Sequence, residues 1–453
     1  MYVCGPTVYN HIHIGNARSA IVFDVIRRYL AWRGYEVTFV QNYTDIDDRI
    51  IVRAAQQKRP ADEVAADYSR AFEAVMTALD VAPPDILVKA TEHISEMIEM
   101  IETLIEKGFA YAAGGSVWFS VEGFEGYGKL SGRTLDDVRA GERVEPDVNK
   151  RQPLDFSVWK AAKEGEPSWE SPWGPGRPGW HIECSAMSAK YLGMGFDIHG
   201  GGTDLIFPHH ENEIAQSEAA FGTAPFAKYW LHNGMINMDA IKMSKSLGNF
   251  VLAKELLETV RPQVLRLMAV SGHYRTDLDF GENSLDQAAR TIERFDTFAA
   301  ETKDFDGPVS PEGQKYLDEF TEAMDDDFNT PAALGVVHDL LKRANTVVTG
   351  GLGGVAAPGR YDLGAPEAAN PPKSTEVAGL VAAFRQMTDV LGISVAFDSK
   401  DGLPDDLMQL VEAREAARKD GRFDESDRIR DELGRLGVSL KDGPEGTTWR
   451  LKN

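Results

Sequence analysis

The chain has 453 residues, of which 43% are hydrophobic and 26% are charged, a composition typical of a globular protein with about three domains. No apolar run approaches the roughly 18 residues of a membrane span, and the N-terminus lacks the basic start and apolar core of a secretory signal. We therefore expect a cytoplasmic protein with no membrane contact. The formal net charge of −23 argues against a broad basic surface for nucleic acid. Residues 411–453, however, contain ten basic and ten acidic side chains, so any RNA contact would be confined to particular faces.

The N-terminal residues predict a βαβ unit. Residues 2–8 are typical of a buried strand, 16–33 have a helical pattern that ends before Gly34, and 35–40 are typical of a second strand. A strand, a glycine-containing turn, a helix and a second strand imply a parallel sheet and a Rossmann-like α/β core.

The middle of the chain predicts an interruption of this core and then its continuation. Residues 52–108 have helical patterns, and 166–180 contain too many Pro, Gly and Trp for a regular element. We therefore expect an insertion at about 80–180. A strand at 196–199 and a helix at 207–221 then resume the nucleotide-binding fold.

From about residue 285 the sequence predicts mainly helices. A Gly-, Ala- and Pro-rich segment at 350–372 is typical of a loop or linker. Helices resume at 374–392 and 403–436, and a small hairpin closes the chain at 439–451. The expected domains are a Rossmann-like catalytic domain at 1–235, a connecting segment at 236–284, a helical bundle at 285–395 and a small C-terminal domain at 396–453.

The turn between the first strand and its helix has the sequence His13-Ile14-Gly15-Asn16. Backbone N–H groups at a helix start suit phosphate binding, and Gly15 allows a nucleotide to approach the backbone closely. His13 can donate a hydrogen bond to a phosphoryl oxygen. The alternative is a turn histidine with Asn16 as a helix cap, and this motif alone does not decide between them.

A second motif, KMSKS at 242–246, is followed by Gly248. Lys242 and Lys245 stand three apart in a Ser- and Gly-containing loop, where they can follow the charge that grows on departing pyrophosphate. Together the two motifs resemble the HIGH and KMSKS motifs of class I aminoacyl-tRNA synthetases. Asn16 occupies the fourth position of the first motif, where the HIGH motif has His. Its amide keeps hydrogen-bond donors but carries no charge, so the effect of this residue on the reaction rate is an open question.

A third group of residues is suited to zinc. His209 and Glu213 are four apart on an expected helix and share one face, which His210 does not share. Cys4 follows the first strand, and Cys184 is the only other cysteine. Because loops after parallel strands meet at one edge of a sheet, these four side chains can converge, and their donor atoms suit tetrahedral zinc. The alternative is two buried thiols and a surface His–Glu pair.

Longer segments, in order along the chain, resemble the cysteinyl-tRNA synthetases. They are MYVCGPTVYNHIHIGNAR, NYTDIDDRI, GWHIECSAM, DIHGGGTDLIFPHHENEIAQSE, KMSKSLGN, MDDDFNTPAAL and DGPEGTTWRL. The resemblance implies activation of L-cysteine by ATP with Mg²⁺ and transfer of cysteine to the 3′-terminal adenosine of tRNA(Cys). It also implies one Zn²⁺ that selects the cysteine thiolate, an anticodon-binding domain at 396–453, and a monomer.

The resemblance also implies roles for single residues. The zinc ligands would be Cys4, Cys184, His209 and Glu213. Negative charge during activation would be stabilised by His13, Asn16, Lys242 and Lys245. The ATP site would comprise Gly5, Thr7, His13, Gly15, Asn16, Gly200, Asp204 and Lys245. Candidates for shaping the cysteine pocket are Thr44, Trp180 and His199, and candidates for RNA contact are Arg422, Arg428 and Trp449. For the cysteine-pocket candidates and the RNA-contact candidates, a purely structural role is the alternative.

Two other functions stay open at this point. A related ligase that joins cysteine to the amine of an amino sugar would share the zinc and nucleotide chemistry, but it would lack an RNA-reading tail such as residues 411–453. A catalytically silent RNA-binding relative would not need the lysine motif and the complete set of zinc ligands.

Overall fold

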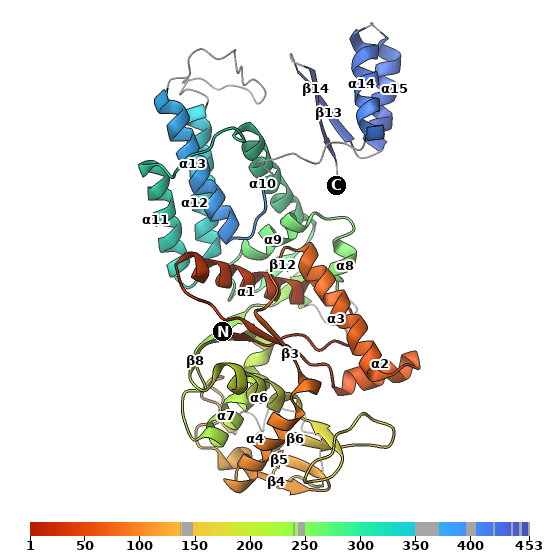
Figure 1. Cartoon of the computed structure of the whole chain (residues 1–453), viewed down its shortest axis with the longest axis vertical. Coiled ribbons are helices and arrows are strands. Elements are labelled where there is room, and N and C mark those ends of the chain that lie inside the picture. The colour runs from red at the N-terminus through yellow and green to blue at the C-terminus, as the bar shows by residue number, and fades with distance from the viewer. Residues whose placement is uncertain are drawn as a thin grey trace.

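The computed structural model of the chain describes residues 1–135, 137, 148–238, 241–242, 250–348, 371–395, 405–419, 422–435, 438–443 and 446–451, and the statements below concern these residues. The parallel sheet and helix α1 lie in the middle of the molecule, an antiparallel sheet lies at one end, and the helical bundle and a terminal hairpin lie at the other (Figure 1). Among the described helices, none combines the length and the apolar character needed to cross a membrane.

A five-stranded parallel sheet forms the centre of the catalytic part. Its order is β3-β2-β1-β8-β9, and its strands are Tyr2–Val3 (β1), Val40–Tyr43 (β2), Ile86–Lys89 (β3), Phe196–Gly202 (β8) and Ala227–Asn233 (β9). This is the doubly wound order of a Rossmann-like fold, so the predicted fold class is confirmed. The chain leaves β1 and β8 toward opposite sides, and a crevice opens where these strands end.

Helix α1 (Ile14–Trp32) connects β1 to β2, close to the predicted range. Its apolar residues at helical spacing, such as Ala17, Ile21 and Val25, are buried. They belong to a hydrophobic core that continues into the helical bundle. Helix α1 therefore holds the catalytic part and the bundle together.

Two predicted strands differ from the observed ones. The strand expected at 2–8 ends at Val3, ahead of Pro6, which has no N–H to donate to a neighbouring strand. The strand expected at 35–40 begins only at Val40, because Tyr35 is 66% exposed and lies outside the sheet.

An antiparallel sheet of order β4-β5-β6-β7 lies inside the expected insertion. Its strands are Ala110–Ala113 (β4), Ser116–Phe119 (β5), Phe156–Ala161 (β6) and Gly176–Pro178 (β7). The helices between the first strands of the chain and this sheet are α2 (Asp48–Gln57), α3 (Ala61–Ala78) and α4 (Ile94–Glu106). Strand β3 also falls between residues 80 and 180, yet it pairs with β2, so the main sheet extends into this range.

Two helices after the insertion carry much of the site, α6 (Trp180–Leu192) and α7 (Glu211–Phe221). The helix predicted at 207–221 is regular only from Glu211. A π-helical turn at Ile206–His210 precedes it, and Phe207 in that turn has an extended backbone (φ −137°, ψ 131°).

The second half of the chain begins with a small sheet of β10 (Ile236–Met238), β11 (Ile241–Lys242) and β12 (Leu278–Phe280). The helices are α8 (Ala253–Leu256), α9 (Pro262–Val270), α10 (Glu282–Glu301), α11 (Pro311–Asp325), α12 (Thr330–Val348) and α13 (Pro371–Val390). The predicted predominance of helices after residue 285 is confirmed.

The C-terminal elements are α14 (Asp405–Lys419), α15 (Phe423–Arg435), β13 (Val438–Gly443) and β14 (Gly446–Leu451). The helical stretch expected at 403–436 is thus two helices. The hairpin at the end of the chain is confirmed, with β13 and β14 antiparallel. The loop expected at 350–372 lies, up to residue 370, outside the described residues.

Candidate active site

A cavity of about 420 Å³ opens at the crevice where β1 and β8 end. Its wall consists of the turn after β1, the start of α1, the segments at the ends of β8 and β9, and single residues from β2, α2, α3 and α6. The lining residues include Cys4, Gly5, Thr7, Tyr9, His13, Gly15, Asn16, Arg49, Trp180, Asp204, Asn233, Gly234, Met235 and Ile236. Much of the predicted nucleotide site therefore faces one cavity.

The turn at 13–16 presents polar groups to this cavity. His13 is the N-cap of α1, and its Nδ1 accepts a hydrogen bond from the Gly15 N–H at 3.1 Å. The Asn16 Oδ1 accepts one from the His13 N–H at 3.3 Å. In a neutral imidazole the other nitrogen, Nε2, then carries the proton and is a donor. The capping role that was the alternative for His13 and Asn16 is present, and both residues also line the cavity.

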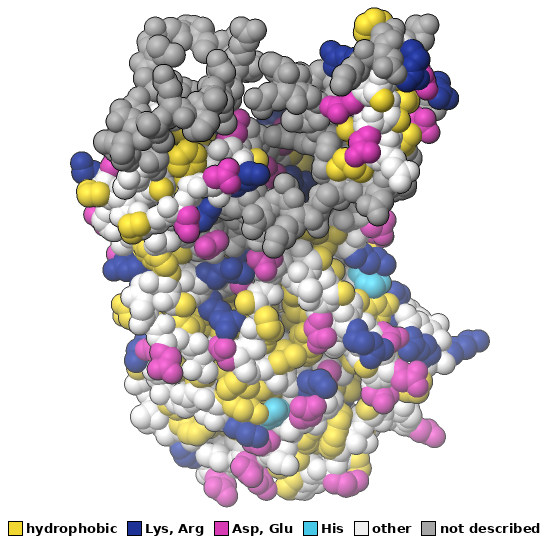
Figure 2. Space-filling model, turned by 45° about the horizontal axis from the view of Figure 1, so that its top comes forward, with side chains coloured by type: hydrophobic (Ala, Val, Ile, Leu, Met, Phe, Trp, Pro, Cys, Tyr) yellow, Lys and Arg dark blue, Asp and Glu magenta, His cyan; other side chains and the backbone are white. Residues whose placement is uncertain are grey.

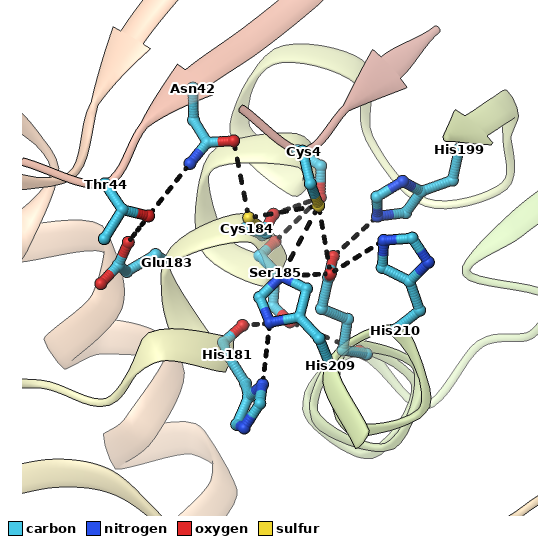
Figure 3. Close-up of polar contacts among 12 residues, drawn as sticks. Cys4, Asn42, Thr44, His181, Glu183, Cys184, Ser185, His199, His209 and His210 are labelled. Atoms are coloured by element: carbon cyan, nitrogen blue, oxygen red, sulfur yellow. Dashed lines mark hydrogen bonds and ion pairs between the residues drawn. The ribbon is translucent and has the colours of Figure 1, made fainter. Parts of the chain in front are cut away.

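Four side chains from distant parts of the chain meet beside the cavity (Figure 3). The Cys4 Sγ lies 3.6 Å from the Cys184 Sγ, 3.6 Å from the His209 Nε2 and 3.5 Å from the Glu213 Oε1. The His209 Nε2 and the Glu213 Oε1 are 3.0 Å apart. All four donor atoms lie within 4.8 Å of one another. Cys184, His209 and Glu213 are almost fully buried, whereas Cys4 lines the cavity.

Three of these four separations fit a tetrahedral zinc site, whereas the 3.0 Å between the His209 Nε2 and the Glu213 Oε1 is a hydrogen-bond distance that zinc would have to widen. With Zn–S bonds of about 2.3 Å and Zn–N or Zn–O bonds of about 2.0 Å, the edges of the tetrahedron are roughly 3.3–3.8 Å. The sulfur–sulfur and sulfur–nitrogen distances of 3.6 Å fall within that range. Two thiols, an imidazole and a carboxylate are also donors that zinc accepts.

Further histidines surround these four residues (Figure 3). The His199 Nε2 lies 2.7 Å from the Glu213 Oε2, and the His181 Nδ1 lies 2.9 Å from the His209 Nδ1. Such outer partners orient the donor atoms of metal ligands. The expectation that His210 lies on a different face is wrong. It stands three residues before Glu213, and its Nε2 lies 3.9 Å from the Glu213 Oε1.

Burial and hydrogen bonding set the ionisation of the cluster. Burial opposes ionisation of Cys184, but hydrogen bonds with Cys4 and His209 outweigh it and lower the pKa of this thiol to about 6. Burial, together with Cys184, raises the pKa of the Cys4 thiol well above its usual value. Burial also disfavours the Glu213 carboxylate, yet the charges of His199 and His209 hold its pKa well below the usual value. Cys184 and Glu213 thus supply the negative charge that a divalent cation requires.

The three residues expected to shape the cysteine pocket lie in different places. Trp180 lines the cavity, and its ring centroid lies 4.2 Å from that of His209. His199 is fully buried against Glu213 behind the cluster. Thr44 is also buried, and its hydroxyl donates to the Glu183 carboxylate at 2.8 Å.

Only some of the residues expected at the ATP site line the cavity. Gly5, Thr7 and Asp204 line the cavity together with the turn at 13–16. An added Cβ on Gly200 would meet the Phe23 ring at 2.3 Å, so its small size allows α1 to pack on β8. Lys242 lies in β11, but its side chain and the whole of Lys245 lie outside the described residues.

Arg49 lines the cavity and was not singled out from the sequence. Its guanidinium lies over the rings of Tyr9 at 5.2 Å and Trp180 at 5.8 Å and donates to the Thr7 Oγ1 at 3.1 Å. A signal existed, because Arg49 follows β2 closely and so reaches the same sheet edge as the residues after β1.

Asn42 and His181 support the cluster and were also missed. The Asn42 Oδ1 accepts a hydrogen bond from the Gly5 N–H at 2.9 Å and lies 3.7 Å from the Cys184 Sγ. His181 precedes Cys184 by three positions on α6, a spacing that puts both on one helical face. Only the spacing of His181 was visible in the sequence.

Comparisons with known proteins agree with this architecture. The family model described as the tRNA synthetases class I (C) catalytic domain matches residues 1–290, the DALR domain model matches 319–396, and the cysteinyl-tRNA ligase anticodon binding domain model matches 400–450. Curated relatives named cysteine–tRNA ligase include those of Geobacter metallireducens and Brevibacillus brevis. Each is 48% identical, over 467 and 464 residues, and each alignment covers 100% of this chain and 95% of the relative.

Solved structures share the fold at low sequence identity. Mycobacterium tuberculosis methionyl-tRNA synthetase bound by methionyl-adenylate has a TM-score of 0.63 at 16% identity, covering 86% of this chain and 91% of that chain. A putative arginyl-tRNA synthetase from Campylobacter jejuni has a TM-score of 0.56 at 14% identity, covering 87% and 93%. Because identity to the curated relatives extends over the whole chain and the three domain models match in order, the chain belongs to the cysteine–tRNA ligase family of class I aminoacyl-tRNA synthetases and is an aminoacyl-tRNA ligase.

Proposed function

We propose that this chain activates L-cysteine with ATP, transfers it to the 3′-terminal adenosine of tRNA(Cys), and selects cysteine through one zinc ion held by Cys4, Cys184, His209 and Glu213. The observation that carries the proposal is the convergence of these four donor atoms within 4.8 Å. Cys4 faces the cavity that also contains the start of α1. An amino acid bound there by its sulfur could present its carboxylate to the phosphates of ATP.

Selection is the difficult part of this reaction. Serine and cysteine differ by one atom, and an apolar pocket separates such analogues by only about 1–3 kcal/mol. When bound, the zinc ion supplies a soft Lewis acid that prefers a thiolate to a hydroxyl. Cys184 and Glu213 hold negative charge at neutral pH, His181 and His199 orient their neighbours, and Trp180 closes the pocket over His209.

In the activation step a carboxylate oxygen of cysteine attacks the α-phosphorus of ATP. A new O–P bond forms, the bond from the α-phosphorus to the bridging oxygen breaks, and pyrophosphate leaves with Mg²⁺. The Nε2–H of His13, the amide of Asn16 and the N–H groups at the start of α1 would donate to the phosphate oxygens. Lys242 and Lys245 would stabilise the departing pyrophosphate.

The transfer step brings tRNA to the same cavity, where a terminal ribose hydroxyl attacks the carbonyl carbon of the adenylate and AMP leaves. We assign the bundle at 285–395 to contacts along the tRNA and the domain at 396–453 to the anticodon, whose bases would be read by stacking and edge contacts. Basic and acidic side chains are interspersed on the face in Figure 2, which favours small RNA contact areas over one broad basic surface. Arg422 and Arg428 are exposed and stay candidates for RNA contact, as does Trp449. A cytoplasmic monomer is the expected form.

The test is ATP–pyrophosphate exchange with protein of known zinc content. We expect exchange that depends on cysteine and is almost absent with serine, about one zinc per chain, and charging of tRNA(Cys) that weakens as salt rises. Exchange without charging, together with ligation of cysteine to an amino sugar, would identify the amino-sugar ligase instead. Zinc-free protein that still rejects serine would refute selection by zinc.

A further inference from the structure

We propose that Arg18 is a positioning residue for adenylate formation: it fixes the cavity wall at 233–236 against the turn at 13–16, and the helical bundle acts on the same wall through Asp327. The proposal rests on the proposed placement of ATP in this cavity, but it does not depend on the zinc ion.

Arg18 lies in the first turns of α1, between Asn16 and Ser19, which both line the cavity, and it is fully buried. Its Nη1 donates to the carbonyls of Gly234 and Met235, both at 2.9 Å. Its Nη2 donates to the Thr276 carbonyl at 2.7 Å and to the His273 carbonyl at 3.4 Å. A planar guanidinium has the forked donors to bridge two pairs of carbonyls, which an ammonium group lacks. Arg18 therefore ties two loops to the helix that begins at the proposed phosphate site.

The first of these loops is part of the cavity. Gly234 and Met235 line it and lead directly into β10, which pairs with β11, the strand that contains Lys242. Ser19 adds a second tie from α1, since its hydroxyl donates to the Asn233 Oδ1 at 2.8 Å. Side chains from one helix thus set the distance between the wall and the turn at 13–16.

The second loop, the turn at 273–276, is held from its other side by the helical bundle. The Asp327 carboxylate, between α11 and α12, accepts hydrogen bonds from the Tyr274 hydroxyl at 2.8 Å and from the Arg275 Nη2 at 2.9 Å. The Tyr274 carbonyl in turn accepts one from the Gly234 N–H at 2.7 Å. A short chain of hydrogen bonds therefore runs from the bundle to the cavity wall.

The geometry along this chain is tightly constrained. Asp327 and Phe328 both have a φ of 55°, a left-handed conformation that is rare for a bulky residue such as Phe. The Phe328 ring packs on Tyr274, with ring centroids 6.4 Å apart. An added Cβ on Gly234 would meet the Thr276 carbonyl oxygen at 2.2 Å. Strained backbone conformations persist only where the surrounding contacts hold them in place. The position of the cavity wall is therefore sensitive to the position of Asp327.

Asp325 provides a matched comparison within the same turn of the bundle. Its carboxylate accepts hydrogen bonds from the Tyr29 hydroxyl and from the Arg33 guanidinium, both at 2.6 Å. These partners lie at the far end of α1, away from the turn at 13–16. Loss of the Asp325 contacts should therefore weaken docking of the bundle without moving the cavity wall.

The experiment compares Arg18→Lys, Asp327→Asn and Asp325→Asn in the full chain. Rates are normalised to active sites by the burst of adenylate formation, and zinc content and Tm are measured for each variant. We expect Arg18→Lys to lower kcat of ATP–pyrophosphate exchange by about tenfold or more, because small misplacements of reacting groups have effects of this size or larger, with little change in KM for cysteine. Asp327→Asn should lower the same kcat by about threefold, and Asp325→Asn should not.

A purely structural role for Arg18 predicts fewer active sites or a lower Tm, but a wild-type kcat per active site. That result for both Arg18→Lys and Asp327→Asn would overturn the proposal. Equal losses of kcat in the two Asp variants would overturn the specific role of Asp327. His13→Ala in the same series tests the placement of ATP in this cavity, on which the role of Arg18 rests. An unchanged KM for ATP in that variant would refute this placement.

Discussion

The sulfur atoms of Cys4 and Cys184 lie 3.6 Å apart, although 180 positions separate the two residues in the chain. Cys4 follows β1, and Cys184 lies on the helix before β8, the neighbour of β1 in the sheet. Both thiols are free, and their separation is close to the sulfur–sulfur edge of a zinc tetrahedron, about 3.8 Å. The parallel topology thus brings the only two thiols of the chain to one point.

Each of Cys4→Ser and Cys184→Ser should abolish zinc binding, because a serine hydroxyl is a poor ligand for zinc in this kind of site. Metal analysis should find about one zinc per wild-type chain and almost none in either variant, with a parallel loss of cysteine-dependent pyrophosphate exchange. Met187→Leu is the control for altered packing in α6, since Met187 is buried there and the swap conserves volume. Wild-type zinc content in both serine variants would contradict the proposed site.

Asn16 should affect both the rate and the stability of the protein. Asn16→Ala removes the acceptor for the His13 N–H and the amide donor in the cavity. We expect kcat for exchange to fall by about tenfold or more and the free energy of unfolding to fall by about 1 kcal/mol or less. Asn16→His keeps a donor and should retain more activity than Asn16→Ala. Equal activities of the two variants would show that the donor at this position does not contribute to catalysis.

The role of Thr44 can be separated from substrate binding by a stability measurement. Its hydroxyl donates to the buried Glu183 carboxyl group at 2.8 Å, so Thr44→Val should cost about 1–3 kcal/mol by leaving a buried carboxyl oxygen without this donor. The KM for cysteine should change little, because the Thr44 side chain lies behind the cavity wall. Thr44→Ser keeps the hydroxyl and is the control. A large rise in KM with unchanged stability would instead place Thr44 in contact with cysteine.

The parts of the fold and site that sequence patterns predicted depend on local spacing and on sheet topology. The helical pattern that became α1 and the alternation of strands and helices are local signals. The rule that loops after parallel strands meet at one edge was enough to bring Cys4, after β1, to the i, i+4 pair of His209 and Glu213, after β8. It does not cover Cys184, which lies on α6 between the antiparallel sheet and β8. The assignment of all four residues to zinc stays a prediction.

Other contacts could not be predicted because no period in the sequence encodes them. Arg18 has the spacing of an ordinary helical residue, yet its Nη1 donates to a carbonyl 216 positions later. Such a contact depends on where loops from different parts of the chain pack, and this is decided only in the folded protein. The exclusion of His210 was a different kind of error, because a regular helix also places residues three apart, such as His210 and Glu213, on one face.

His232 at the end of β9 predicts how stability depends on pH. Its Nε2 lies 2.8 Å from the His210 Nδ1. Burial first, and then the charges of His199 and Arg275, lower the pKa of His232 to about 4 from an ordinary value of 6.5. Between these two values the unfolded chain binds a proton that the folded chain does not, so the free energy of unfolding falls as the pH falls through this window.

Replacing His232 by Gln removes this titration and keeps a side chain that can form a hydrogen bond with His210. Because one pKa unit corresponds to about 1.4 kcal/mol, the variant should gain about 2 kcal/mol of stability relative to wild type between pH 7 and pH 5. Urea unfolding of both proteins in chelator measures this difference without a contribution from zinc release. Below about pH 4 the difference should level off, since His232 is then protonated in both states of the wild type. A difference that stays constant from pH 7 to pH 5 would mean that the folded protein takes up a proton at His232 as readily as the unfolded chain does.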